Sequence, residues 1–210
     1  MRIISGEFRG HSIKPPADRE TRPMLDRVRE AMFSTLGNAV VDADVLDLYA
    51  GTGSLGLEAL SRGASFVRFV ERGRSPRTLL EENIAALELE PYSEVQSGDA
   101  LRSTSWRRPI QAPSPESDEG GEDSAQEEPS RSSEAWADLI FMDPPYPIWK
   151  DGALRSQALE AIEDLIVNYM DPNGVLVLHT APRDLDESDF ERPAESRRYG
   201  RSILWYLKGS

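Results

Sequence analysis

The stretch DPPY, Asp143 to Tyr146, combines residue types that could hold an amine of a nucleobase. It follows residues 139–142, LIFM, an apolar run that predicts a buried strand, which the two prolines end. The Asp143 carboxylate and the Pro144 carbonyl can accept both hydrogens of an exocyclic amine and orient its lone pair. Pro145 brings no competing N–H donor, and Tyr146 offers a ring for stacking. The motif predicts chemistry on a base that is unpaired or flipped out.

A glycine-rich stretch, DLYAGTGSLG, supplies a second motif. Gly51, Gly53 and Gly56 have the spacing G-x-G-x-x-G, directly after a predicted strand and before a predicted helix. Glu71 follows 20 residues after Gly51, at the end of the next predicted strand. This pattern is typical of a dinucleotide-binding fold, in which the acid accepts hydrogen bonds from ribose hydroxyls. An NAD-dependent oxidoreductase is therefore one interpretation.

Asp47 favours a different ligand. It stands four residues before Gly51, where a carboxylate suits an ammonium group, directly or through water, and disfavours a pyrophosphate. S-adenosylmethionine carries an ammonium and no phosphate. Its ribose would reach Glu71 and its adenine Asp99, while the glycines, Gly53 included, would let the backbone approach its methionyl group. We therefore favour a methyltransferase over a dehydrogenase.

The rest of the chain alternates between strand and helix patterns. We expect a small hairpin within residues 1–20 and then a helix that ends at Gly37. Further strands are expected at 45–49, 66–71, 94–97, 139–142 and 175–179, with two antiparallel strands within 196–207. Further helices are expected over 54–62, 75–87 (with Ser75 as N-cap) and 154–169. The alternation predicts an α/β fold with a doubly wound, mostly parallel sheet, whose carboxyl edge gathers the strand-end acids in one crevice.

The composition limits the other classes. The 210 residues include no cysteine and two histidines, so we expect neither disulfides nor a metal site. We also expect a soluble, cytoplasmic protein, because no apolar run could span a membrane and the first residues lack a signal-peptide core. The formal net charge is -13, and 21 of the 24 basic residues are arginine. This balance fits a halophilic source or a simple bias toward arginine.

Several stretches together resemble one family. RIISGEFRG (2–10), RPMLDRVREAMF (22–33), LDLYAGTGSLGLEALSRGA (46–64), DPPY and the YGRSILWYL ending are similar to the RsmD family of small-subunit rRNA guanine-N2 methyltransferases. The first two stretches single out this family, because many amino-methyltransferases share the other motifs. The resemblance implies a seven-stranded class I methyltransferase (Rossmann-like) sheet and S-adenosylmethionine as methyl donor. It implies as substrate a guanine of 16S rRNA in an assembled or partly assembled small subunit.

The resemblance also implies roles for single residues. It implies that the cofactor is bound by Asp47, Gly51, Gly53, Glu71 and Asp99. It implies that catalysis is carried out by Asp143, Pro144, Pro145 and Tyr146. Two features depart from the family: Met24-Leu25 stands where small hydroxyl residues are usual, and residues 111–135 form an insertion. Within it, residues 113–134 hold eight acids and one arginine, which predicts disorder.

Basic residues concentrate near the start of the chain. Residues 1–30 hold seven basic and five acidic side chains, net +2 in a chain of -13. We therefore expect residues 1–37 to form an RNA-facing hairpin and helix beside a methyltransferase domain at 38–210. The expected phosphate contacts are Arg9, Arg22, Arg27 and Arg29, followed by Arg197, Arg198 and Arg201.

Two further interpretations stay open beside the dehydrogenase. DPPY fits an adenine-N6 methyltransferase of DNA or RNA equally well, because both targets are exocyclic amines. A non-catalytic ribosome-assembly factor could retain the same fold. In each case we expect a monomer.

Overall fold

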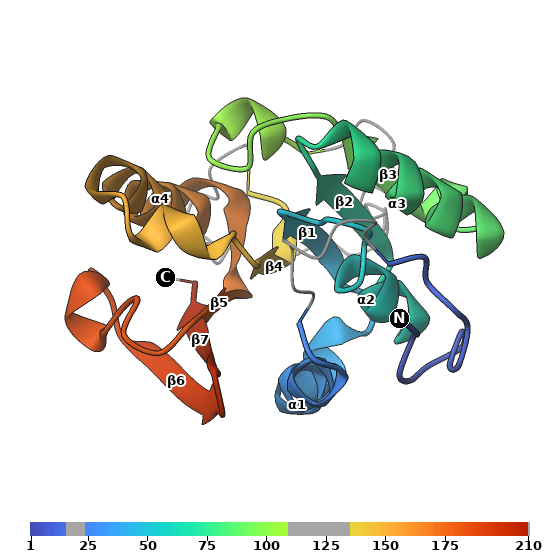
Figure 1. Cartoon of the computed structure of the whole chain (residues 1–210), viewed down its shortest axis with the longest axis horizontal. Coiled ribbons are helices and arrows are strands. Elements are labelled where there is room, and N and C mark those ends of the chain that lie inside the picture. Colours follow the sequence, from blue (N-terminus) through green and yellow to red (C-terminus); the bar gives the residue numbers. More distant parts are fainter. Residues whose placement is uncertain (16–23, 109–134, 210) are drawn as a thin grey trace, which may run out of the picture.

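The chain folds around one sheet. The computed structural model describes residues 1–15, 24–108 and 135–209. Its seven strands lie in the order β3-β2-β1-β4-β5-β7-β6 (Figure 1). They are β1 (Asp44–Leu48), β2 (Phe66–Val70), β3 (Ser93–Gln96), β4 (Ala137–Met142), β5 (Met170–Thr180), β6 (Ala194–Tyr199) and β7 (Ser202–Lys208). Strands β1 to β5 are parallel, β7 is antiparallel to β5, and β6 is antiparallel to β7. The predicted doubly wound, mostly parallel seven-stranded sheet is confirmed.

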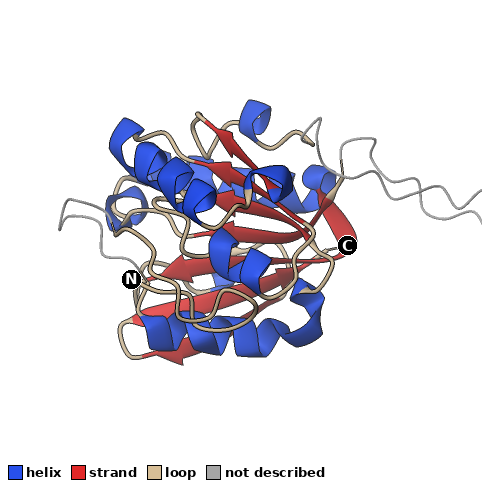
Figure 2. Ribbon diagram, turned by 90° about the vertical axis from the view of Figure 1, so that its right-hand side faces the viewer, coloured by secondary structure: helices blue, strands red, loops and turns tan. Residues whose placement is uncertain are grey.

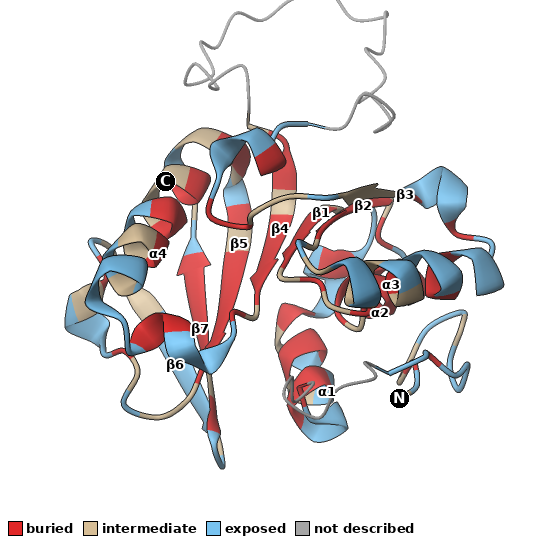
Figure 3. Ribbon diagram, turned by 45° about the horizontal axis from the view of Figure 1, so that its top comes forward, coloured by how far each residue is buried: buried red, intermediate tan, exposed pale blue. Residues whose placement is uncertain are grey.

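Helices cover both faces of the sheet (Figure 2). Side chains of α1 (Asp26–Leu36), α2 (Gly56–Ser61) and α3 (Arg74–Ala86) join one apolar core, and those of α4 (Gly152–Asp164) and the π-helix η5 (Leu165–Tyr169) join a second. Strand β4 contributes side chains to both cores, because successive residues of a strand point to opposite faces. Leu139 and Phe141 belong to the first core, and Ile140 and Met142 belong to the second. The central strands are therefore buried on both sides (Figure 3).

The strand order reverses beside β1. The chain runs outward from β1 through β2 to β3, and then returns to place β4 on the other side of β1. Ligands of open α/β sheets bind outside the carboxyl ends of the strands at such a switch point. The glycine loop follows β1 and DPPY follows β4, so the fold brings both motifs to this place.

The N-terminal segment forms the predicted hairpin in an irregular form. An antiparallel bridge joins Arg2 to Ser12, and backbone bonds join Ile3 to His11 and Ile13 to Met1, but residues 1–15 form no regular strand. The segment is also held on α2, where two of its backbone N–H groups donate to the Glu58 carboxylate. Gly6 lies so close to α2 that a Cβ there would meet the Ser61 carbonyl oxygen at 1.6 Å. Residues 1–15 and α1 also contribute to the first core, so the separate role predicted for 1–37 stays a prediction about function.

Three local predictions have different outcomes. Helix α1 ends at Gly37, at φ +55, as predicted. The β6–β7 turn at Gly200, φ +65, is also confirmed. The prediction of Ser75 as N-cap is wrong, since α3 begins at Arg74 with Gly73 as its N-cap. The predicted insertion at 111–135 lies outside the described residues except for Ala135. Within the described ranges, every helix is too short or too polar to cross a membrane.

Candidate active site

The three glycines of the loop after β1 have different surroundings. Gly51 has φ +58, and a Cβ on it would meet nothing closer than 4.0 Å, the Tyr49 carbonyl oxygen. A Cβ on Gly53 would meet Leu80 at 2.4 Å, and one on Gly56 would meet Phe69 at 2.2 Å. The second and third glycines are therefore needed for packing of the loop on α3 and β2. Gly51 is the position where the loop leaves room for a ligand.

Asp47 lies beneath this loop. Its side chain is buried, and its Oδ2 accepts a hydrogen bond from the Gly56 N–H at 2.9 Å. Burial raises the pKa of Asp47 to about 8, although the bond from Gly56 opposes this rise. The neighbouring carboxyls of Asp143 and Glu71 raise the pKa further. Acids from the ends of β1, β2 and β4 therefore lie close enough to act on one another.

Glu71, at the end of β2, is held to the glycine loop. Its Oε2 accepts from the Gly51 N–H at 2.9 Å, and its Oε1 accepts from the Gly73 N–H at 2.6 Å. The side chain thus joins the loops that follow β1 and β2, where the ribose is expected.

Asp99 follows β3, at the outer end of the same edge. Its Oδ1 accepts from the Leu101 N–H at 3.0 Å, which caps its own turn. It also lies near Tyr49 of the glycine loop, since burial and then the charge of Asp99 raise the pKa of that phenol. The four acids predicted to bind cofactor or substrate therefore all lie around the switch point.

DPPY forms a rigid loop at the end of β4. The Asp143 side chain is 27% exposed, and its Oδ1 lies 2.7 Å from Nδ1 of His179 on β5. Pro144 is buried, and the Pro145 carbonyl accepts from the Ile148 N–H at 3.1 Å, which closes the turn. Ile148 and Trp149 then anchor the loop in the second core, whereas Tyr146 stays 41% exposed. The loop presents the carboxylate and the ring that the sequence predicted.

This arrangement suits one of the two cofactors considered. The carboxyl groups of Asp47, Glu71 and Asp143 lie together in the crevice, which disfavours the pyrophosphate of a dinucleotide and favours a cation. S-adenosylmethionine carries a sulfonium and an ammonium, and the same acids would stabilise both charges. The residues present therefore fit S-adenosylmethionine, with Gly51 as the point of close approach.

Arg29 does not have its predicted role. Its side chain is fully buried, its Nη2 donates to the Arg2 carbonyl at 2.5 Å, and its Nε lies 3.7 Å from the buried Glu58 carboxylate. Glu58 also accepts from Arg62 Nε at 2.8 Å. The prediction of an RNA contact at Arg29 is wrong, because this arginine joins α1 and the N-terminal segment to α2.

The other predicted RNA contacts have different positions. Arg22 lies outside the described residues. Arg9 is exposed, on a loop held against Ser61 at the end of α2. Arg27 is exposed beside the β6–β7 turn, where a Cβ on Gly200 would meet its Nη2 at 3.1 Å.

His179 is the site residue that sequence reasoning missed. The sequence places it at the end of an apolar strand, but only the pairing of β5 with β4 reveals its neighbour. Met142 pairs with Leu178, so the next residues, Asp143 and His179, lie side by side. The signal available in the sequence was that His179 is a polar residue directly after the apolar run of β5, as Asp143 is after that of β4.

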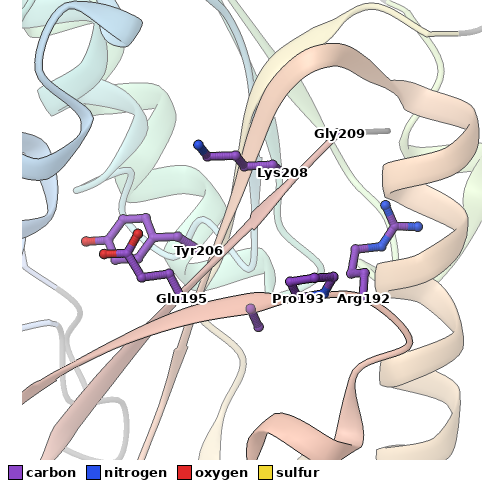
Figure 4. Close-up of a pocket in the computed structure, with 7 residues that line it drawn as sticks. Arg192, Pro193, Glu195, Tyr206, Lys208 and Gly209 are labelled. Carbon is purple, nitrogen blue, oxygen red and sulfur yellow. The ribbon is translucent and has the colours of Figure 1, made fainter.

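A pocket of about 660 Å³ lies elsewhere (Figure 4). It is lined by residues 192–195 and by Tyr206, Lys208 and Gly209. Lys208 pairs with Val175, so the pocket lies toward the end of the sheet opposite Asp143. It contains no predicted site residue. In the part of the chain that the structure describes, no cluster of His, Asp and Glu suits a metal ion.

A parallel sheet that reverses beside β1 and has an antiparallel β7 between β5 and β6 is the sheet of class I methyltransferases, and the acids at its switch point suit their cofactor. The protein is therefore a class I methyltransferase. A solved structure of YhhF from Escherichia coli agrees with this fold, at a TM-score of 0.72 and 24% identity over 100% of this chain and 98% of that one.

Sequence comparison identifies the family. A family model described as "Conserved hypothetical protein 95" matches residues 1–113. YlbH of Bacillus subtilis is 33% identical over 179 residues, which cover 84% of this chain and 80% of YlbH. "Ribosomal RNA small subunit methyltransferase D" of Escherichia coli is 45% identical over 87 residues, 41% of this chain and 44% of that protein. The chain belongs to the family of the matched model, the RsmD family that its motifs resemble.

Proposed function

We propose that this protein transfers a methyl group from S-adenosylmethionine to the exocyclic N2 amine of a guanine in 16S rRNA of the small ribosomal subunit. The position of Asp143 carries this proposal. The carboxylate ends the strand beside β1, is partly exposed, and lies near enough to Asp47 to raise its pKa. An amine held by Asp143 would therefore lie opposite a cofactor held above Gly51.

The names of the relatives support the same reaction. The Escherichia coli relative is named for the small-subunit rRNA, as is a Haemophilus influenzae protein that is 28% identical over 181 residues, 86% of this chain and 78% of that one. A 16S rRNA N2 methyltransferase of Thermus thermophilus, solved with AdoMet and guanosine, shares the fold. Its TM-score is 0.62 at 19% identity, over 90% of this chain and 45% of that chain. The fold is thus one that accommodates guanine-N2 methylation.

The acids around the glycine loop would hold the cofactor. When bound, S-adenosylmethionine supplies an electrophilic methyl group. Glu71 would accept hydrogen bonds from the ribose hydroxyls, and Asp99 would lie near the adenine. Asp47 would stabilise the ammonium, and a cation there favours the charged form of this carboxyl, whose pKa burial raises.

The DPPY loop would hold the acceptor. The amine of guanine is a weak nucleophile because its lone pair is delocalised into the ring. Asp143 and the Pro144 carbonyl would accept its two hydrogens and turn the lone pair toward the cofactor. Asp143 is also the base positioned to take the proton that the amine loses once the methyl group is attached. Tyr146, which is exposed, would stack on the flipped-out base.

A group of arginines at the carboxyl edge would bind the RNA backbone. Thr180, at the end of β5, pairs with Ile203, so the β6–β7 turn lies at the same edge as Asp143. Arg27, Arg198 and Arg201 are exposed around this turn. None of the three forms a salt bridge with a described residue, whereas Arg197 is paired with Glu195 and bonded to Thr35. These three guanidiniums are the phosphate contacts that we propose, and a monomer suffices for the site.

The test is methylation with labelled S-adenosylmethionine of undermethylated small subunits, naked 16S rRNA and DNA, followed by nucleoside mass spectrometry. The proposal expects N2-methylguanine, formed most efficiently in assembled or partly assembled subunits. N6-methyladenine in any sample would favour the adenine-N6 alternative. RNA binding without methyl transfer would indicate an assembly factor.

A further inference from the structure

We propose that His179 is a positioning residue for Asp143. The histidine holds one oxygen of the carboxylate from the β5 side and leaves the second oxygen for the substrate amine. The proposal rests on the proposed function, because it assumes that Asp143 receives that amine. His179 lies on β5, outside both motifs that sequence reasoning assigned to the site.

The pairing of β4 with β5 produces this contact. The two strands are parallel, with Phe141 opposite Val177 and Met142 opposite Leu178. One residue further, each strand changes from apolar to polar, at Asp143 and at His179. Their side chains meet at 2.7 Å between Oδ1 and Nδ1, with 27% of the Asp143 side chain exposed and 7% of the His179 side chain. The contact thus runs from the interior of the sheet to the crevice.

The chemistry of the pair indicates which atom carries the proton. An ionised carboxylate only accepts hydrogen bonds, so Nδ1 of His179 must donate to it. Nε2 is buried and has no partner among the described residues. Among the described residues Asp143 is therefore the one hydrogen-bond partner of the ring, and His179 acts as its donor through Nδ1.

Packing alone does not require a histidine at this place. The four residues that precede it on β5, Val175 to Leu178, are apolar, so an apolar side chain would continue their pattern. Thr180 follows and accepts from the Trp205 indole N–H at 2.9 Å, so the end of β5 has its own anchor. The particular property of His179 is its donor at Nδ1, and that donor is used on Asp143.

Fixing one oxygen has a consequence for the reaction. A free carboxylate rotates about its terminal bond, but a bond to Oδ1 confines the group to one orientation. The amine then meets an acceptor that is already in place, and misplacement of a reacting group by about 1 Å can slow a reaction about 10²-fold. Loss of the donor should therefore lower the rate of methyl transfer and leave cofactor binding unchanged.

The test compares His179→Phe with His179→Asn. Phe keeps a ring and removes the donor, whereas the Asn amide nitrogen reproduces the donor at the place of Nδ1. We expect single-turnover transfer at saturating cofactor to fall about 10- to 100-fold in His179→Phe and to return most of the way in His179→Asn. Calorimetric affinity for S-adenosylhomocysteine should be equal in all three proteins. Equal rates in His179→Phe and the wild type, or equally slow rates in both variants, would overturn the proposal.

A second measurement does not depend on the variants folding. The chain has two histidines, His11 and His179, so the ring nitrogens of His179 can be assigned by nuclear magnetic resonance with a His11→Gln control. We expect a proton on Nδ1 in the free protein, because this nitrogen faces Asp143. A proton on Nε2 alone would overturn the proposal. Failure of the wild type to methylate any RNA would instead contradict the proposed function and leave the tautomer result standing.

Discussion

The two halves of the crevice use their carboxylates differently. In the cofactor half, Asp47 and Glu71 accept hydrogen bonds from backbone N–H groups of the glycine loop and its neighbour. In the acceptor half, Asp143 is bonded through one oxygen by a side chain of the adjacent strand. A ligand that binds Glu71 must therefore share or replace existing bonds, because both of its oxygens accept, whereas Asp143 keeps an oxygen ready. Substitutions in the cofactor half should alter the affinity for the cofactor, and substitutions in the acceptor half should alter the rate of methyl transfer.

The largest effect is expected at Asp143. Asp143→Ala removes the acceptor that orients the amine, and loss of one such group typically lowers turnover about 10²- to 10³-fold. Because the cofactor half is intact, affinity for S-adenosylhomocysteine should change little. Single-turnover transfer and calorimetry on the same preparation measure both. A large loss of affinity with an unchanged rate would reverse the assignment of the two halves.

Glu71→Ala should lower the affinity for the cofactor and leave the rate of methyl transfer nearly unchanged. It removes the carboxylate that holds Gly51 and that we propose binds the ribose. Because hydrogen bonds to charged groups contribute about 1.5 to 3 kcal/mol, affinity for S-adenosylhomocysteine should fall about tenfold or more. The rate at saturating cofactor should stay near that of the wild type. Glu90→Ala, at an exposed glutamate that begins the short 3-10 helix after α3 (Glu90–Tyr92), is the matched control. Equal affinities in the two variants would remove Glu71 from the site.

Asp47 should link cofactor binding to protons. Its pKa in the free protein is raised from 3.8 to about 8, chiefly by burial, so it is mostly protonated at pH 7. A bound cation favours the ionised form, and binding should release a proton, seen as a dependence of the calorimetric heat on the ionisation enthalpy of the buffer. Affinity should rise as the pH rises toward 8. Asp47→Asn should abolish this dependence, and its persistence in the variant would assign the proton to another group.

The same pKa shift predicts a trend in stability. A group whose pKa is raised on folding contributes stability that is present in full below its unfolded pKa, here 3.8, and is lost as the pH rises through about 8. The difference in melting temperature between the wild type and Asp47→Asn should therefore move against the wild type between pH 5 and 8. A constant difference would show that Asp47 is not buried as the structure has it.

The smallest effects are expected at the edge of the crevice. Arg27→Ala and Arg201→Ala should each weaken RNA binding and reduce the salt dependence of log K by about one unit. Lys208→Ala removes one positive charge at the opposite end of β7 and is the control. Arg9→Ala decides whether the N-terminal loop also contacts RNA. If Lys208→Ala matched the arginine variants, the effect would come from net charge and not from this surface.

The main features of the site could be predicted because they depend on local pattern. Asp47 lies one residue before the end of β1, and Asp143 directly follows β4, so each interrupts an apolar pattern. The parallel order that brings strand ends together follows from the alternation of strands and helices. The glycine spacing predicted the loop, but the structure was needed to separate Gly51, which faces open space, from Gly53 and Gly56, which pack.

The remainder depends on partners that are distant in the sequence. Arg29 follows the buried Val28 and lies three residues before the buried Met32, on the inner side of α1. It pairs with Asp26 one turn earlier and with the buried Glu58 of α2. No pattern near residue 29 reveals the pairing with Glu58, so its charge suggested a surface. His179 required the register of β5 against β4. Ser75 is not the N-cap because α3 already begins at Arg74. The N-cap is Gly73, whose N–H donates to Glu71.

The most direct test of the central claim is a crystal structure with S-adenosylhomocysteine and guanosine. The account predicts that N2 of the guanine lies about 3 Å from Oδ2 of Asp143, with Oδ1 still bonded to His179 and the cofactor above Gly51. A guanine whose N2 is bound by another group, with the Asp143 side chain turned out of the crevice, would contradict it.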